Sequence, residues 1–198
     1  MSSCYNSYSR DVPINLCSLY QNTSLLKSLS PVFFVRSMEQ IPCPCCGGDH
    51  RVIGSRQRKY SKGSGEQCIL VIRRLRCKQC KRIHHELPDI LVPYKRYDSE
   101  SIEAVVTGNA ALSVAADEST LARWRSWFQT HSSYFLGCLN SIAIRFFNGT
   151  PEGVPSLPYS VLHSIWQHTG NSAGWLARVV RPITNMNLWT HTRFAFLS

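Results

Sequence analysis

Two pairs of cysteines constrain the fold more than any other feature of this sequence. Cys43 and Cys46 form one C-x-x-C pair, and Cys77 and Cys80 form a second. Four thiolates from two such pairs can surround one Zn²⁺ as a tetrahedron, at about 2.3 Å from the ion. The 30 residues between the pairs suit the two arms of a β-hairpin. The pattern therefore predicts a structural zinc site in a small β zinc ribbon.

The other five cysteines have no ligand-like spacing, and the total of nine is odd. Cys45 lies inside the first pair, and Cys68 lies in an apolar stretch that predicts a strand. An odd number of cysteines, without a basic and apolar leader at the N-terminus, favours metal binding in a reducing compartment over a disulfide framework. We therefore expect a cytoplasmic protein. One of the nearby histidines (His50, His84 or His85) could replace a cysteine ligand, although four thiolates already saturate the ion.

The 198 residues divide into four segments by composition and periodicity. Residues 1–40 are rich in Ser, Asn and Tyr and predict a poorly ordered N-terminal arm. Residues 41–97 predict the zinc ribbon, 98–131 a helix-turn-helix, and 132–198 a C-terminal helical region. The predicted fold class is α+β, with a small β zinc ribbon followed by an all-α helix-turn-helix region and C-terminal helices.

The apolar period changes from two to about 3.6 after Tyr97, which predicts helices from there on. Ser99 is a good N-cap for a first helix that ends at Gly108-Asn109, and 110–116 predicts a short second helix. A third helix, from 119 to about 130, places Trp124 and Phe128 on one face. Further helices are predicted around 135–146, 159–168 and 172–181.

The positive charge of the chain is concentrated beside the cysteine motif. Of the net charge of +10, residues 51–97 carry thirteen basic and three acidic groups, whereas 98–118 carry five acids and no base. A surface so rich in cations predicts a polyanion as partner, and contacts with phosphates supply affinity but little sequence preference. The candidate phosphate-binding residues of the ribbon are Arg56, Arg58, Lys59, Lys62, Arg73, Arg74, Arg76, Lys78, Lys81 and Arg82.

The start of the third predicted helix supplies candidates for reading DNA sequence. In a helix-turn-helix, the N-terminal residues of the recognition helix contact base edges in the major groove. Arg123 could contact a guanine, Ser119 or Thr120 a base or a phosphate, and Arg125 the DNA backbone. An ordinary helical bundle with a buried Trp is the alternative interpretation of the same pattern.

The order of the motifs resembles a known group of proteins. Cys43-Pro-Cys-Cys-Gly47, the basic strand, Cys77-Lys-Gln-Cys80, Leu87-Pro-Asp-Ile-Leu-Val-Pro-Tyr-Lys-Arg-Tyr97 and Ser119-Thr-Leu-Ala-Arg-Trp-Arg-Ser-Trp-Phe128 follow one another. Over 42–130, and in the tail from 159, the chain resembles an uncharacterised bacterial family of zinc-ribbon plus helix-turn-helix proteins, similar to the N-terminal part of insertion-sequence transposases. The resemblance implies this architecture and a DNA context, but no reaction and no catalytic residues.

The chain is expected to bind DNA rather than to catalyse a reaction. Two-metal DNA cleavage needs several carboxylates, but the sequence after residue 118 contains a single acid, Glu152. We expect a mobile-element-associated regulator or transposition accessory protein that binds double-stranded DNA, with a separate transposase or recombinase subunit as a candidate partner. No membrane partner is expected, because no apolar stretch approaches the ~20 residues of a span. The alternatives are a catalytic recombinase or transposase fragment and an RNA-binding zinc-ribbon protein.

Overall fold

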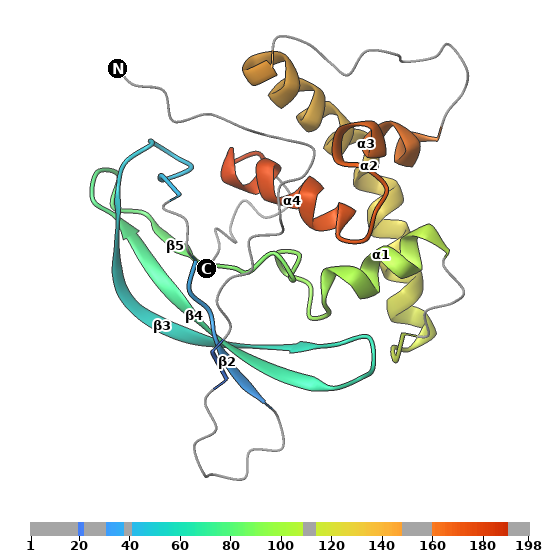
Figure 1. Ribbon diagram of the computed structural model, residues 1–198, viewed down its shortest axis with the longest axis horizontal. Helices are drawn as coiled ribbons and strands as arrows, with labels where there is room; N and C mark the ends of the chain where they lie inside the picture. Colours follow the sequence, from blue (N-terminus) through green and yellow to red (C-terminus); the bar gives the residue numbers. More distant parts are fainter. Residues whose placement is uncertain (1–19, 22–30, 38–40, 109–113, 148–159, 190–198) are drawn as a thin grey trace.

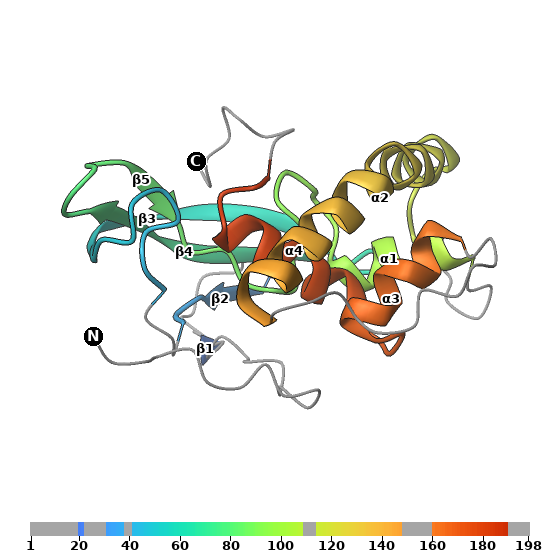
Figure 2. The same ribbon diagram turned by 90° about the horizontal axis from the view of Figure 1, so that it is seen from above.

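A computed structural model describes residues 20–21, 31–37, 41–108, 114–147 and 160–189. A small mixed sheet comes first in the chain and four helices follow, which confirms the predicted α+β class and the order of its two parts. The strands gather on one side of the molecule and the helices on the other (Figures 1 and 2). The strands are β1 (Tyr20–Gln21), β2 (Val32–Phe34), β3 (His50–Ser61), β4 (Gln67–Cys77) and β5 (Ile83–His85), and the helices are α1 (Ser99–Thr107), α2 (Glu118–Phe147), α3 (Val161–Thr169) and α4 (Trp175–Asn185).

The long hairpin of β3 and β4 is the frame of the sheet. The two strands pair antiparallel from His50 opposite Cys77 to Ser61 opposite Gln67, with a shift of register between Val52 and Gly54 that leaves Ile53 unpaired. Alternate residues of β4 (Cys68, Leu70 and Ile72) are buried, as expected of a strand with one apolar face. β5 returns along the other edge of β4, beside the end of the strand that carries Cys77.

The N-terminal segment contributes to this sheet, which corrects the expectation of a poorly ordered arm for part of 1–40. β2 pairs parallel to β4, with Val32 opposite Ile69, and β1 pairs with β2. Val35 is buried in the core of the sheet. The β-branched and aromatic run 32–35 favours a strand, and β4 offers it an unpaired edge. The rest of the predicted arm, 1–19, 22–30 and 38–40, lies outside the described residues.

The first helix begins and ends close to the predicted residues, although Asp98 and not the predicted Ser99 is its N-cap, and the next helix is much longer than predicted. α1 is capped by Asp98, whose carboxylate accepts a hydrogen bond from Ser101 N at 2.9 Å, and it ends at Gly108. α2 is one helix of 30 residues that joins the predicted helices 119–130 and 135–146 and crosses the expected boundary at 131. Of the predicted helix 110–116, residues 114–116 are not helical and 110–113 lie outside the described residues.

The helices enclose an aromatic core. Phe135 at the middle of α2 is fully buried, and its ring stacks on Trp189 with 5.4 Å between centroids. Phe128 meets Trp175 of α4 edge to face at 5.5 Å. The buried carboxylate of Glu103 in α1 accepts hydrogen bonds from Gly174 N and Leu176 N at the start of α4. These contacts join α1, α2 and α4 into one packed unit.

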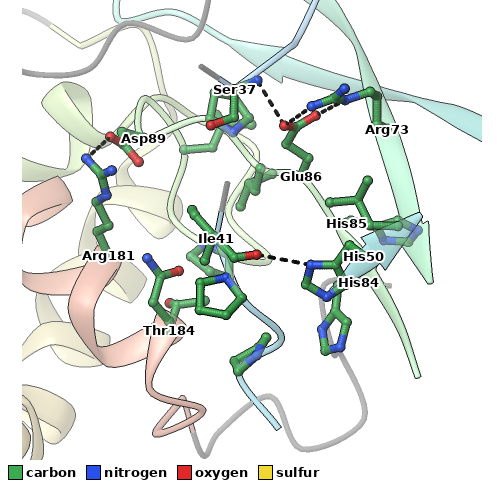
Figure 3. A pocket seen from close by; sticks show the side chains of 18 of the residues that line it. Ser37, Ile41, His50, Arg73, His84, His85, Glu86, Asp89, Arg181 and Thr184 are labelled. Carbon is green, nitrogen blue, oxygen red and sulfur yellow. Dashed lines mark hydrogen bonds and ion pairs between the residues drawn. The ribbon is translucent and has the colours of Figure 1, made fainter. Parts of the chain in front are cut away.

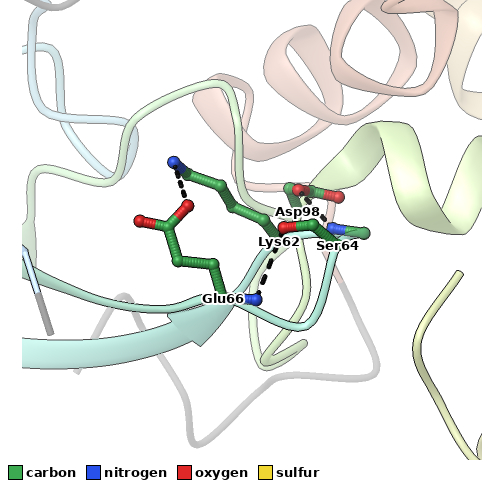
Figure 4. A network of polar contacts seen from close by, with 5 residues as sticks. Lys62, Ser64, Glu66 and Asp98 are labelled. Carbon is green, nitrogen blue, oxygen red and sulfur yellow. Dashed lines mark hydrogen bonds and ion pairs between the residues drawn. The ribbon is translucent and has the colours of Figure 1, made fainter. Parts of the chain in front are cut away.

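The tip of the hairpin is attached to the first helix (Figure 4). Asp98 accepts a hydrogen bond from Gly63 N at 3.3 Å while it also caps α1, and Ser61 exchanges backbone hydrogen bonds with Arg96 and Asp98. Lys62 and Glu66 form an ion pair of 2.8 Å across the turn. The sheet and the helices are therefore connected through the tip, which lies far along the hairpin from the cysteines.

Among the described residues, no helix combines the length and the apolar character needed to cross a bilayer.

Candidate metal centre and basic face

Each cysteine pair forms a tight backbone turn. Cys46 N and Gly47 N both donate to the carbonyl of Cys43, and in the second turn Gln79 N donates to the Cys77 sulfur at 3.4 Å. The residue after each pair has a positive φ, 74° at Gly47 and 64° at Lys81. Glycine adopts this conformation without strain, whereas a lysine does so at a cost. The two turns are therefore alike in backbone shape although their sequences differ.

The four predicted ligands come together. The sulfur atoms of Cys43, Cys46, Cys77 and Cys80 all lie within 4.8 Å of one another. Cys43 and Cys80 are 3.6 Å apart, and Cys46 and Cys77 are 3.5 Å apart. A tetrahedron with metal–sulfur bonds of about 2.3 Å has edges of roughly 3.8 Å. The cluster could therefore hold one metal ion, and its four members are the predicted cysteines.

The protein environment acts on these thiols in opposite directions. Burial raises the pKa of Cys43 to about 12, although the backbone N–H groups of Cys45 and Cys46 oppose it. Burial also acts to raise the pKa of Cys77, but backbone N–H groups of Cys80 and Gln79 and the neighbouring thiols together lower it to about 6. A metal binds the thiolate form of cysteine. An ion at this site would therefore displace the proton of Cys43, whereas the lowered pKa of Cys77 already favours its thiolate form.

Cys45 is not part of the cluster. Its sulfur accepts a hydrogen bond from Arg82 Nη1 at 3.2 Å. Cys68 is fully buried in the core of the sheet, as expected for a small apolar side chain in a strand.

Two histidines lie beside the cluster, on the side of Cys43. His84 in β5 is 3% exposed, and its Nε2 is 3.4 Å from the Cys43 sulfur. The ring of His50 meets the ring of His84 edge to face, with 5.1 Å between centroids. Burial, together with the charges of His50, Arg82 and His85, lowers the pKa of His84 to about 4, so this ring is neutral at pH 7. Cys43, His50 and His84 offer ligand atoms within 4.8 Å of one another.

A cavity of about 550 Å³ opens next to these histidines, between the sheet and α4 (Figure 3). Three polar atoms of lining residues (His50 Nε2, His84 Nδ1 and Thr184 Oγ1) are buried and have no partner in the described part of the chain. Two ion pairs also line it, Arg73 with Glu86 and Arg181 with Asp89.

The ten predicted basic residues of the ribbon differ in their contacts and in their positions on the hairpin. Several are held by groups of the protein: Arg73 pairs with Glu86, Arg58 donates to the carbonyl of Lys95 at 2.9 Å, and Lys62 pairs with Glu66. Arg82 contacts Cys45. Three of the remaining six also have partners within the protein. Arg76 Nε donates to the carbonyl of Lys81 at 3.3 Å, Lys81 Nζ donates to the carbonyl of Lys78 at 2.6 Å, and Lys78 lies 3.8 Å from the carboxylate of Asp49.

Apart from Arg58, Lys62, Arg73, Arg82 and Lys59, the predicted basic residues gather toward the cysteine end of the hairpin. Alternate residues 72, 74 and 76 of β4 share one face, and their partners on β3 share it with them. Arg76 lies opposite Arg51, a residue that is not among the predicted phosphate contacts. Ile72 lies opposite Arg56. Lys59 is exposed and pairs with Ile69, which places it on the opposite face. We define the basic face as Arg51, Arg56, Arg74 and Arg76, together with Lys78 and Lys81 on the second cysteine turn.

The predicted base-reading residues form a local network at the start of α2. Asp117 accepts hydrogen bonds from the Ser119 hydroxyl at 2.6 Å and from Thr120 N at 2.7 Å, and these groups lower its pKa to about 2. Arg123 donates to the hydroxyls of both residues. Arg125 is exposed on the same helix. In both overall views this end of α2 lies at the opposite end of the molecule from the cysteine turns (Figures 1 and 2).

Part of the chain matches a known protein family. Residues 43–124, less than half of the chain, match a family described as a domain of unknown function (DUF6431). This match spans both cysteine turns, the hairpin, α1 and the first residues of α2. No curated protein and no solved structure matches the chain.

Proposed function

We propose that this chain is a zinc-containing protein that binds double-stranded DNA through the basic face. The proposal depends chiefly on one observation, that Arg51 and Arg76 lie directly opposite each other on neighbouring strands. Like charges in such a pair destabilise a sheet. Neither side chain forms an ion pair with an acid of the described chain. A phosphate bound between them would replace this repulsion with attraction.

Zinc is the ion we propose for the four-cysteine cluster. Four thiolates at tetrahedral spacing suit Zn²⁺, which has no geometric preference of its own and tolerates this closed arrangement. The ion would hold the two turns together, and so would hold Lys78 and Lys81 beside the arginines of the hairpin. In this proposal the metal has a structural role.

The biological context that we propose comes from the resemblance to transposase N-terminal parts. A regulator or accessory protein of a mobile element needs to bind DNA but not to cut it. The single acid after residue 118, Glu152, supports a role without catalysis. A separate transposase or recombinase subunit would then be its protein partner.

The proposal is tested by measuring the affinity for duplex DNA as a function of salt. Full-length protein is titrated into labelled duplexes of random sequence and into a duplex selected from a random pool. Arg74→Ala should weaken binding to both about equally and should lower the salt slope by about one. Lys62→Ala is the matched control, because it removes the same charge from a residue that is paired with Glu66 at the far tip. It should change neither quantity appreciably.

A second arm of the same experiment tests the start of α2. If Arg123 reads a base, Arg123→Ala should cost about 1–3 kcal/mol on the selected duplex and much less on random DNA. Equal weakening on both duplexes would restrict the role of α2 to packing or backbone contact.

Equal effects of Arg74→Ala and Lys62→Ala would refute the basic face as the binding surface. Tighter binding to an RNA duplex of the same sequence would reassign the partner to RNA.

A further inference from the structure

We infer that Cys43, His50 and His84 form a second metal site, which shares the Cys43 thiolate with the four-cysteine cluster. All three offer ligand atoms within 4.8 Å of one another, and Cys43 is the residue common to the two sets. The distance of 3.4 Å between the Cys43 sulfur and His84 Nε2 agrees with two ligands of one ion. For a tetrahedral Zn²⁺ with one sulfur and one nitrogen ligand, that distance is roughly 3.5 Å.

The hydrogen bond of His50 fixes which of its nitrogens can bind an ion. His50 Nδ1 lies 3.2 Å from the carbonyl oxygen of Ile41. A carbonyl oxygen can only accept, so Nδ1 carries the proton and Nε2 presents its lone pair. Metal-bound histidines typically donate their other N–H to a backbone carbonyl in this way.

The free lone pair of His50 is the second observation that supports a ligand. His50 Nε2 is buried and has no partner within the described part of the chain. A buried acceptor without a partner costs free energy, so such groups are rare in folded proteins. An ion bound between His50 and His84 would satisfy this atom.

The balance of charge also favours a second cation. One divalent ion with four thiolates carries a net charge of −2, and both Cys43 and Cys77 are buried. A second divalent ion, held by the shared thiolate and two neutral imidazoles, would bring the pair of sites to zero net charge. Two of the four thiols are buried, Cys46 is exposed and Cys80 is partly buried, so only part of this negative charge is screened by water, and the first ion would favour the second through the rest.

The second site has room for an exchangeable ligand. Three protein ligands leave one position of a tetrahedral ion open, and His50 and His84 line the 550 Å³ cavity. A water molecule or an oxygen of a small ligand could occupy that position. A mixed set of one sulfur and two nitrogens suits Zn²⁺ or Co²⁺ rather than Mg²⁺ or Ca²⁺.

The test is the number and type of bound ions in the full chain. Full-length protein is titrated with Co²⁺, which replaces zinc and absorbs visible light, and the bound metal is measured after gel filtration. We expect about two ions per chain, one with the charge-transfer bands of four thiolates and one with the weaker spectrum of a mixed ligand set. His50→Ala should remove the second ion and leave the first. His163→Ala, which changes a histidine of α3 away from the site, should retain both.

The inference rests on the four-cysteine cluster but not on DNA binding, and the outcomes separate the two metal sites. One ion per chain in the wild type, lost in Cys77→Ser and unaffected by His50→Ala, would overturn the second site and leave the first intact. In that case His84 Nε2 donates a hydrogen bond to the Cys43 thiolate. No bound ion in the wild type would overturn both sites.

Discussion

The sheet and the helical region are stabilised by different means. The core of the sheet is small, and its buried members are Val35, Tyr60, Cys68, Leu70, Ile72 and Leu91. The core of the helices contains Phe128, Phe135 and several tryptophans, with many aliphatic neighbours. Large buried aromatic side chains contribute most to the stability of a core. The helical region therefore has a substantial core of its own, whereas the cysteine end of the sheet does not.

This difference predicts which part of the fold would depend on the proposed metal ion. The tip of the hairpin is held by Asp98 and α1, and the middle of β4 by the core of the sheet. Beyond Ile72 the strand continues to Cys77, and the apolar residues around that end are exposed: Val52, Ile53 and Ile83 are each more than a third exposed. An ion bound by the four thiolates is what would hold this end in place.

Removal of the metal should give the largest effect. Chelation, or Cys77→Ser, should abolish amide protection in the two cysteine turns, by about two orders of magnitude or more in exchange rate. The amides of α2 and α4 should keep their protection, because their core lies elsewhere. Hydrogen exchange measured by mass spectrometry tests this, with Cys138→Ser as the control for a cysteine in the helical core. Loss of protection throughout the chain would show that the two regions fold as one unit.

The converse experiment changes the helical core. Phe135→Ala removes a fully buried ring at the centre of α2 and should cost about 3–5 kcal/mol of unfolding free energy. The bound metal per chain should stay the same, because no cysteine of the cluster contacts this core. Chemical denaturation and metal analysis measure the two quantities. Phe147→Ala, at a side chain that is 55% exposed, should change stability by less than about 0.5 kcal/mol. A parallel loss of metal in Phe135→Ala would contradict the independence of the two regions.

The features that local sequence determines were predicted well. The spacing of the cysteines identified the cluster because each turn is made by four adjacent residues and needs few other contacts. The α+β class and the position of α1 followed from periodicity and from Gly108 at the end of the helix, although its N-cap is Asp98 and not the predicted Ser99. The apolar pattern predicted two helices, 119–130 and 135–146, but α2 runs through both because Phe135 and Leu139 are buried in the same core as Phe128.

The features that depend on distant contacts could not be read from the sequence. His84 meets Cys43 across 41 residues, and Arg73 meets Glu86 through the pairing of β4 and β5. The sequence shows a basic block, but only the register of the strands shows which members share a face. The same register revealed Arg51 as a member of that face.

The smallest predicted effect concerns the backbone of the second cysteine turn. Lys81 occupies the position that glycine occupies in the first turn, with φ of 64°. A non-glycine residue pays steric strain in this conformation, although glycine loses more entropy on folding. Lys81→Gly should therefore be more stable than Lys81→Ala by about 0.5–1 kcal/mol. Both variants lose the ammonium group and its hydrogen bond to the carbonyl of Lys78. The difference between their unfolding free energies therefore measures the effect of the backbone conformation at residue 81.

The Lys81→Gly and Lys81→Ala variants also probe the cysteine end of the hairpin, where we propose that a metal binds. Unfolding of the cysteine end should be followed by the loss of the Co²⁺–thiolate absorption as denaturant is added. Signals from the helices need not change when this end unfolds. With the metal bound, Lys81→Gly should reach half unfolding at a higher denaturant concentration than Lys81→Ala. For DNA, both variants should lower the salt slope by about one, because they remove the same charge. Equal midpoints would mean that the turn relaxes away from a positive φ when Lys81 is replaced. Unequal salt slopes would mean that the shape of the turn, and not only its charge, contributes to DNA binding.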